Sequence, residues 1–432
     1  MSKRIKLQAP TGMHDILPED QKYYKRIYDV VSDIADFYGF SKIDTPVVED
    51  LELFSKGIGV STDIIKKEMY TLKTKGGDSL GLRPEWTTPI VRSYIQNGMH
   101  SLPQPLKLWY FGPCYRYERP QADRYRQFWQ FGFEVFGEQS SVIDAQIIQI
   151  FHNILKELKL KDLMVEINSI GDSNCRPYYK KLLSSYLKNR ESSLCVDCKR
   201  RIKENVLRVL DCKEEKCQPI KTEAPQILDH LCEECHSHFK EVLEFLDEIE
   251  IPYTLNPYLV RGLDYYTKTV FEMFFESDNE VKDLPAGRRA LAGGGRYDKL
   301  VKLIGGKDVP ACGAAAGVER IISLMKAQGI EGAKDLGIQI FLAQLGGLAK
   351  RKSLSLLEDF RKSKIRVGES FGRDSLKAQL NRADKLGAKL TLILGQKEAL
   401  DGVVIIRNMK TGNQETVKLD KAVSAVKAKL KK

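Results

Sequence analysis

The fold is decided by residues 116–134, which have the sequence RYERPQADRYRQFWQFGFE. Two strand-like ends flank a polar, arginine-rich middle, and this pattern predicts a β-hairpin with a long loop. Other strand-like runs have aromatic alternation and short connections, which indicates that the hairpin belongs to an antiparallel sheet. These runs cover residues 43–48, 80–82, 106–111, 127–136, 253–260, 269–275 and 289–292.

The predicted hairpin gathers polar side chains on one face. Because side chains alternate along a strand, Gln130 and Glu134 share a face with Phe128, and Trp129 points to the opposite face. An amide and a carboxylate on one face can bind a small polar group. Arg116 on the partner strand can contact a phosphate through its planar guanidinium. The composition alone fits a solvated hairpin with cross-strand salt bridges equally well.

A second strip, residues 261–266 (RGLDYY), combines a cation, a carboxylate and two phenols. Two glycine-rich segments follow it, 293–298 (GGGRYD) and 313–320 (GAAAGVER). The triple glycine lets the backbone approach a ligand, and the small residues of the second segment suit a helix start packed on a sheet. Neither has the glycine spacing of a P-loop or a Rossmann turn. Tyr265 and Tyr266 are also compatible with core residues that keep a polar tip.

The remaining periodicity divides the chain into two domains. A charged, cysteine-bearing helical region at about 175–246 interrupts the strands and predicts a helical insertion within an α+β domain at 1–328. A linker follows at 329–335. Strands at 338–343, 390–394 and 403–407 then alternate with helices near 351–363 and 375–386, which predicts a compact α/β domain with a mixed sheet at 336–432.

The net charge of +11 is concentrated near the C-terminus. Residues 333–432 carry 22 Lys and Arg against 10 Asp and Glu, whereas the first 332 residues are close to neutral. A basic module on a near-neutral body suggests contact with nucleic acid, although a solvated lysine-rich surface has the same charge. The first ten residues contain no apolar signal segment and the longest apolar runs are strand-length, so we expect a cytoplasmic protein with no membrane partner.

Nine cysteines in a chain without a signal segment argue against a disulfide framework. Six of them are close together in the sequence: Cys195, Cys198, Cys212, Cys217, Cys232 and Cys235. Paired Cys-x-x-Cys units indicate zinc, but the roughly thirty residues between these two units exceed the spacing of a compact zinc ribbon. Structural Zn²⁺ and buried free thiols both remain open, and no metal ligand is assigned.

Taken in order, these segments resemble the class II aminoacyl-tRNA synthetases, and in particular the histidyl-tRNA synthetase family. Residues 43–59 are similar to motif 1 of the class, 116–137 to motif 2 and 313–324 to motif 3. Residues 261–266 and 291–298 match the two signatures of the histidine enzymes. Residues 10–18 (PTGMHDILP) and 82–87 (LRPEWT) also match the family. The resemblance extends into 375–395 of the C-terminal domain and so covers essentially the whole chain.

The resemblance implies a homodimeric ligase that joins L-histidine to tRNA(His) through a histidyl-adenylate made from ATP with Mg²⁺. The C-terminal domain would bind the anticodon. Arg116 would contact the ATP α-phosphate and the histidine carboxylate, Arg261 would reach the α-phosphate from the opposite side, and Arg320 would bind the γ-phosphate. Glu118 would complete the ATP site. Fixed cations stabilise the charge that develops during attack on the α-phosphorus.

The resemblance also implies a set of histidine-binding residues: Glu85, Trp86, Thr87, Arg116, Gln130, Glu134, Arg261, Tyr265 and Tyr266. Glu85 and Thr87 would bind the α-amino group, and Gln130, Glu134 and the tyrosines would surround the imidazole. A site that hydrogen-bonds both ring nitrogens rejects amino acids that lack them, so no editing domain is expected. The motif 2 loop meets the tRNA acceptor end in this family, which implies contacts from Gln121, Arg124 and Arg126.

Two tryptophans depart from the family pattern. Trp129 stands where many relatives have histidine, and because it points away from the polar face of the hairpin we expect only a packing change. Trp86 stands where many relatives have a small residue and lies between two proposed histidine ligands, so it bears on the shape of the amino-group pocket.

The alternative function is a non-catalytic synthetase paralogue that regulates ATP phosphoribosyltransferase. Such paralogues typically lack the C-terminal module and lose catalytic arginines. This chain has the C-terminal module and keeps Arg116, Arg261 and Arg320, which favours the ligase.

Overall fold

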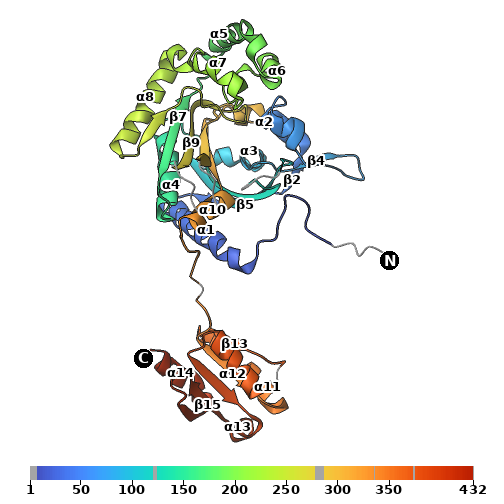
Figure 1. Cartoon of the computed structure of the whole chain (residues 1–432), viewed down its shortest axis with the longest axis vertical. Helices are drawn as coiled ribbons and strands as arrows, with labels where there is room; N and C mark the ends of the chain where they lie inside the picture. The colour runs from blue at the N-terminus through green and yellow to red at the C-terminus, as the bar shows by residue number, and fades with distance from the viewer. Residues whose placement is uncertain (1–6, 120–123, 278–286, 335, 373–374, 432) are drawn as a thin grey trace. The chain divides into compact units, whose positions relative to one another are not determined.

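The computed structural model describes residues 7–119, 124–277, 287–334, 336–372 and 375–431. The chain forms two compact units, Met1–Ala333 and Lys334–Lys432 (Figure 1). No helix among the described residues is long and apolar enough to cross a bilayer.

The N-terminal unit is built on an eight-stranded sheet with the order β1-β5-β6-β11-β10-β9-β7-β8. The six inner strands pair antiparallel, which confirms the predicted antiparallel sheet, and only the edge strands β1 and β8 pair parallel with their neighbours. The strands are β1 (Ser41–Lys42), β5 (Leu106–Tyr115), β6 (Gln127–Phe136), β7 (Leu163–Ser169), β8 (Tyr253–Leu255), β9 (Thr267–Ser277), β10 (Gly287–Arg296) and β11 (Ala311–Gly317).

The hairpin β5–β6 separates two apolar cores, as its alternation predicts. Trp129, Phe131 and Phe133 pack with α1 (Pro18–Phe37), α4 (Val142–Glu157) and α10 (Val318–Ala327). Phe128 and Tyr110 belong to the second core, which includes α3 (Thr87–Gln96) and α9 (Leu300–Leu303). The polar face of β6 therefore lies on the α3 side of the sheet.

Two strand predictions and one helix prediction are wrong in detail. Residues 43–47 form no strand: the Ile43 amide still donates to the Trp109 carbonyl at 2.9 Å, but beyond it Pro46 has no backbone donor and the buried Arg83 guanidinium binds the Thr45 carbonyl at 2.8 Å. Residues 256–260 turn away from the sheet, with the Leu259 amide donating to the Asn256 carbonyl at 2.9 Å. Residues 313–317 belong to strand β11 and do not begin a helix; their lack of bulk serves the pocket described below.

A smaller antiparallel sheet carries the segment that resembles motif 1. Its order is β2-β4-β3, and α2 follows β2 directly. The elements are β2 (Val48–Asp50), α2 (Leu51–Ile58), β3 (Thr71–Lys73) and β4 (Ser79–Leu82). The Asp50 side chain caps α2 by accepting from the Glu52 amide at 2.8 Å.

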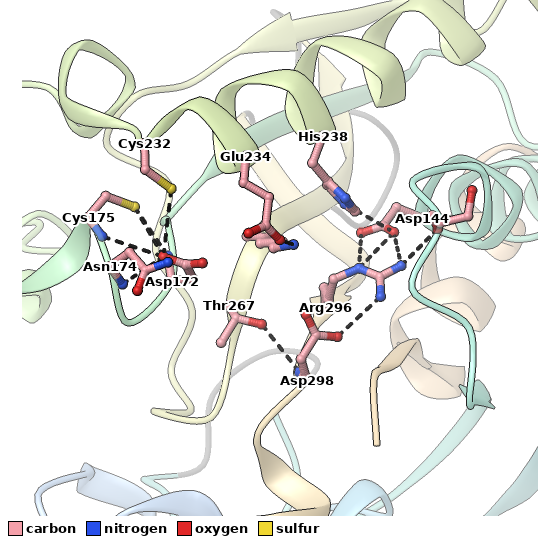
Figure 2. Close-up of polar contacts among 12 residues, drawn as sticks. Asp144, Asp172, Asn174, Cys175, Cys232, Glu234, His238, Thr267, Arg296 and Asp298 are labelled. Atoms are coloured by element: carbon pink, nitrogen blue, oxygen red, sulfur yellow. Dashed lines mark hydrogen bonds and ion pairs between the residues drawn. The ribbon is translucent and has the colours of Figure 1, made fainter. Parts of the chain in front are cut away.

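The predicted helical insertion between β7 and β8 is confirmed. It contains α5 (Arg176–Lys188), α6 (Val196–Glu204), α7 (Gln218–Thr222) and α8 (Glu233–Glu248), with a core of its own. Its last helix, α8, meets a buried ion pair of the sheet domain: Arg296 of β10 donates to both carboxylate oxygens of Asp144 on α4, and His238 of α8 lies 3.5 Å from the same carboxylate (Figure 2). Burial raises the pKa of Asp144, but Arg296 and His238 outweigh this and keep it below its usual range.

The C-terminal unit has the predicted mixed sheet, with the order β13-β12-β14-β15-β16. The first three strands pair parallel and the last two pairings are antiparallel. Helix α13, which has only six residues, is not predicted by the periodicity. The elements are β12 (Ile340–Gln344), α11 (Gly347–Lys362), β13 (Val367–Glu369), α12 (Leu376–Lys385), β14 (Leu390–Leu394), α13 (Gln396–Asp401), β15 (Val403–Asn408), β16 (Gln414–Lys418) and α14 (Ala422–Leu430).

Candidate active site

One pocket over the inner strands of the large sheet collects most of the predicted site residues. Its lining includes Glu85, Trp86, Thr87, Arg116, Glu118, Arg124, Gln130, Arg261, Tyr265, Tyr266 and Arg320. Glu134 lies beneath this surface, 1% exposed, and its Oε1 accepts from the Thr87 hydroxyl at 2.7 Å. Residues from five separate stretches of sequence therefore meet at one place.

Three of the four arginines that line the pocket, Arg116, Arg261 and Arg320, are fixed at close range by other parts of the chain. Arg116 donates from Nε to the Pro84 carbonyl at 2.9 Å, and Arg320 donates to the Ala290 carbonyl at 2.9 Å. Arg261 forms an ion pair with a carboxylate of β9, described below. Such fixed guanidinium groups can bind oxyanions without rearranging.

Arg261 lies flat against the glycine-rich strand β10. A Cβ atom on Gly293 would stand 2.5 Å from its guanidinium, so only glycine leaves room for it. Its charge is paired with Glu272 of β9, and its guanidinium lies 5.7 Å from the centre of the Tyr266 ring. The triple glycine thus admits a protein side chain close to the backbone, where the sequence predicts a ligand.

The run of small residues in β11 makes room for Glu134 in the same way. A Cβ atom on Gly313, which pairs with Glu134 across the strands, would collide with the Glu134 carboxyl group. The second Glu134 oxygen accepts from the Tyr297 hydroxyl. Burial raises the pKa of Glu134 to about 8, against the opposing effect of the Tyr297 and Thr87 hydrogen bonds. In the ligand-free pocket this carboxyl is therefore largely protonated at neutral pH.

Glu85 lies at the start of helix α3. Its two oxygens accept from the backbone amides of Thr87 at 2.6 Å and Thr88 at 2.8 Å, which satisfies two unpaired donors of the helix end. Burial raises the pKa of Glu85 to about 7 even though these donors favour the charged form. The resulting geometry fixes Thr87, whose hydroxyl bridges to Glu134.

Three tyrosines enclose the buried end of the pocket. Tyr265 and Tyr266 have ring centres 4.7 Å apart, and Tyr297 packs edge-on against both. Tyr297 and Glu272 are site residues that the sequence did not single out. The position of Tyr297 within the GGGRYD signature and the single carboxylate of Glu272 in an otherwise apolar stretch of β9 are the signals that mark them.

The two unusual tryptophans differ in their relation to the pocket. Trp86 lines it, stacks on Tyr110 with ring centres 4.7 Å apart, and lies beneath the Arg83 guanidinium at 3.4 Å. It therefore forms part of the wall beside Glu85. Trp129 packs against Tyr24 on the opposite face of the sheet, as predicted.

The three predicted tRNA contacts are separated by the structure. Arg124 lines the pocket, 3.6 Å from Glu118. Arg126 is absent from the pocket lining found among the described residues; it stacks on Tyr117 and donates to the Glu118 carbonyl at 3.1 Å. Gln121 lies outside the described residues.

Comparison with known families gives this pocket its context. The histidyl-tRNA synthetase family model matches residues 12–321, and the anticodon binding domain matches residues 339–429. The chain belongs to the histidyl-tRNA synthetase family. The pocket, the insertion and the large sheet all lie within the match to the synthetase model.

Relatives within the histidyl-tRNA synthetase family match along their whole length. A histidine–tRNA ligase of Dehalococcoides mccartyi is 43% identical over 98% of this chain and 100% of its own, and one of Desulforamulus reducens is 42% identical over 97% and 99%. The solved apo histidyl-tRNA synthetase of S. aureus is 35% identical with a TM-score of 0.80, covering 98% of this chain and 100% of its own. These matches confirm the predicted family and favour the ligase over the regulatory paralogue.

Proposed function

We propose that this pocket activates L-histidine with ATP and that the chain is a histidine–tRNA ligase. In the first step the histidine carboxylate attacks the α-phosphorus of ATP, forming histidyl-adenylate and releasing pyrophosphate. In the second step the 3′-terminal ribose hydroxyl of tRNA(His) attacks the activated carbonyl and AMP leaves. The observation that carries this proposal is one pocket with three fixed arginines at its surface and a buried, hydrogen-bonding end.

The arginines would act on ATP. Arg116 and Arg261 would contact the α-phosphate from two sides and Arg320 the γ-phosphate. Negative charge grows on the phosphate oxygens during attack, and guanidinium groups already fixed by the chain stabilise it without reorganisation. Arg116 would also hold the histidine carboxylate in line with the phosphorus, which removes much of the entropic cost of the encounter.

The buried end would select histidine. Glu134, with Gln130, Tyr265 and Tyr266, would hydrogen-bond the imidazole, and Glu85 and Thr87 would bind the α-amino group. An amino acid without ring nitrogens would leave the Glu134 carboxyl group buried without its partner, at a cost of about 1–3 kcal/mol for each unpaired group. Trp86 would limit the width of the pocket beside the amino group.

Magnesium would enter with ATP. Of the carboxylates that line the pocket, Glu85 accepts from two backbone amides of α3, Glu272 is paired with Arg261, and Glu319 accepts the Trp129 amide at 2.8 Å. Among the described residues Glu118 makes only longer ion pairs, at 3.9 Å to Arg116 and 3.6 Å to Arg124, so it is the side chain that fits Mg²⁺ best. The ion would supply charge neutralisation of the phosphates.

The remaining proposals concern partners. Arg124 and Gln121 would contact the acceptor end of the tRNA, Arg126 would hold their loop in place through Glu118, and the basic C-terminal unit would bind the anticodon.

We also propose a cytoplasmic homodimer that associates through residues 43–59, with domain boundaries near 328 and 336. Light scattering of the purified protein measures the dimer directly, and a mass of one chain would overturn it.

Aminoacylation tests the proposed function. Purified protein with ATP and Mg²⁺ is expected to attach histidine to tRNA(His) and to leave tRNAs of other specificities uncharged. A protein that binds tRNA(His) but attaches no histidine to it would overturn the ligase proposal.

A further inference from the structure

Four cysteines of the helical insertion converge in its core. Cys195 and Cys198 stand at the start of α6, and Cys212 and Cys217 follow within the next twenty residues of chain. All four side chains are buried, and their sulfur atoms all lie within 4.8 Å of one another. None of them forms a disulfide.

The spacing of these sulfurs fits a single metal ion. Tetrahedral Zn²⁺ binds thiolates at about 2.3 Å, which places two ligand sulfurs about 3.8 Å apart. The Sγ atoms of Cys195 and Cys212 are 3.8 Å apart. An iron–sulfur cluster would need a wider arrangement, because its four cysteines are spread over two irons in a [2Fe–2S] cluster and over four irons in a [4Fe–4S] cluster.

Backbone amides already point at two of the sulfurs. The Cys198 amide donates to Cys195 Sγ and the Cys195 amide donates to Cys217 Sγ, both at 3.3 Å. Cys195 also occupies the N-cap of α6, where the helix end favours negative charge. Both features stabilise thiolates, the form that binds a metal.

We propose that Cys195, Cys198, Cys212 and Cys217 bind a structural Zn²⁺ ion. The long interval between the two Cys-x-x-Cys units is then no obstacle, because the second unit belongs to a different cluster. The ion would close the loop at 205–217, which forms only two short 3-10 helices, Val206–Val209 and Glu215–Cys217.

This loop supports the back of the 261–266 strip. The Asn205 side chain donates to Asp264 Oδ1 at 2.8 Å, and Arg208 donates to the Gly262 carbonyl at 3.0 Å. Both residues lie between Cys198 and Cys212 in the sequence. The zinc site would therefore fix the segment that positions Arg261 from outside the pocket.

A second cluster carries a further zinc site independently. Asp172, Cys175, Cys232 and Cys235 also have ligand atoms within 4.8 Å of one another, and the sulfurs of Cys175 and Cys232 lie 3.6 Å and 4.0 Å from Asp172 Oδ1 (Figure 2). Cys232 caps α8 with φ −69° and ψ 161°, and Cys195 caps α6 with φ −70° and ψ 163°. We infer that both Cys-x-x-Cys units bind Zn²⁺ with the same helix-start geometry.

Metal analysis of the full-length protein, purified under reducing conditions and reconstituted with zinc alone, tests both sites. We expect about two zinc ions per chain, and about one in either Cys198→Ser or Cys235→Ser. Cys312→Ala, a buried cysteine outside both clusters, is the matched control and should keep two. If the unaltered protein binds one ion and only Cys198→Ser loses it, the first site is retained and the second is overturned. If the unaltered protein binds one ion and only Cys235→Ser loses it, the second site is retained and the first is overturned.

A measurement on the unaltered chain avoids variants that fail to fold. X-ray absorption at the zinc edge should show sulfur ligands at about 2.3 Å, and Co²⁺ in place of zinc should give thiolate charge-transfer bands. Less than about 0.2 zinc per chain, or stoichiometric iron, would overturn both sites. None of these readouts depends on ligase activity, so a failure of the zinc proposal can be distinguished from a failure of the proposed function.

Discussion

The two ends of the pocket differ in the charge and burial of their side chains. At the outer end Arg116, Arg261 and Arg320 are permanently charged and partly exposed, and each is fixed by a carbonyl or a carboxylate. At the inner end burial raises the pKa of Glu85 to about 7 and that of Glu134 to about 8. The difference teaches that fixed charge suits the proposed binding of a polyphosphate, whereas buried directional hydrogen bonds suit the proposed selection of an imidazole.

Loss of charge at the outer end should have the largest effect. Arg261→Ala is expected to slow adenylate formation about 100-fold or more, because it removes a cation proposed to contact the reacting phosphate. Single-turnover formation of histidyl-adenylate measures this. Arg190→Ala is the matched control, because Arg190 is half-buried like Arg261 but stacks on Tyr186 just beyond α5 and does not line the pocket. A near-normal rate in Arg261→Ala with the fold intact would contradict the assigned role.

Removal of the inner carboxyl group should affect histidine more than ATP. Glu134→Ala is expected to raise KM for histidine roughly tenfold to a hundredfold, because Thr87 and Tyr297 lose their buried acceptor. KM for ATP should change far less, and this internal control separates the two ends. Equal changes in both constants would show that the ends are not distinct.

The protonation of the inner end predicts how stability depends on pH. In the folded, ligand-free protein Glu134 keeps its proton up to a pH of about 8, whereas in the unfolded chain it loses the proton near 4.5. The folded state therefore binds more protons in this window, and the free energy of unfolding should fall as the pH rises through it.

Denaturant unfolding between about pH 5 and 8 measures this dependence. Glu134→Gln should flatten the fall because the amide does not ionise. Glu244→Gln, on the exposed side of α8, should keep the wild-type dependence. An unchanged profile in Glu134→Gln would mean that Glu134 does not carry the effect.

A change on the opposite face of β6 should be nearly silent in activity. Trp129→Phe keeps an aromatic ring against Tyr24 and removes an indole nitrogen that is buried without a partner among the described residues. We expect a stability change below about 1.5 kcal/mol and histidine activation within about twofold of wild type. A large loss of histidine affinity would show that the two faces of the strand are coupled.

The sequence predicts the fold best where alternation is strong and local. Strand β6 begins and ends at the predicted residues 127 and 136, and β14 likewise at 390 and 394. The prediction is wrong at 43–47, because the distant Arg83 takes the carbonyl groups that a strand neighbour would otherwise bind. Local periodicity contains no information about such a long-range competitor.

The same limit applies to the site. Most of the pocket residues follow from motifs in the sequence, whereas the pairing of Glu272 with Arg261 and of Tyr297 with Glu134 emerges only when strands distant in sequence are brought together. The role of Gly293 and Gly313 in making room for side chains is equally a property of strand pairing. The cysteines show it most clearly, since their spacing suggests one paired site and the structure forms two clusters.

Histidine-dependent exchange of pyrophosphate into ATP tests the central claim most directly, because it reports the chemistry of this pocket without tRNA. With pure protein and Mg²⁺, we expect exchange with L-histidine that Arg261→Ala abolishes and Arg190→Ala retains. The absence of exchange above background in the unaltered protein, or equal exchange with amino acids that lack an imidazole, would contradict the account.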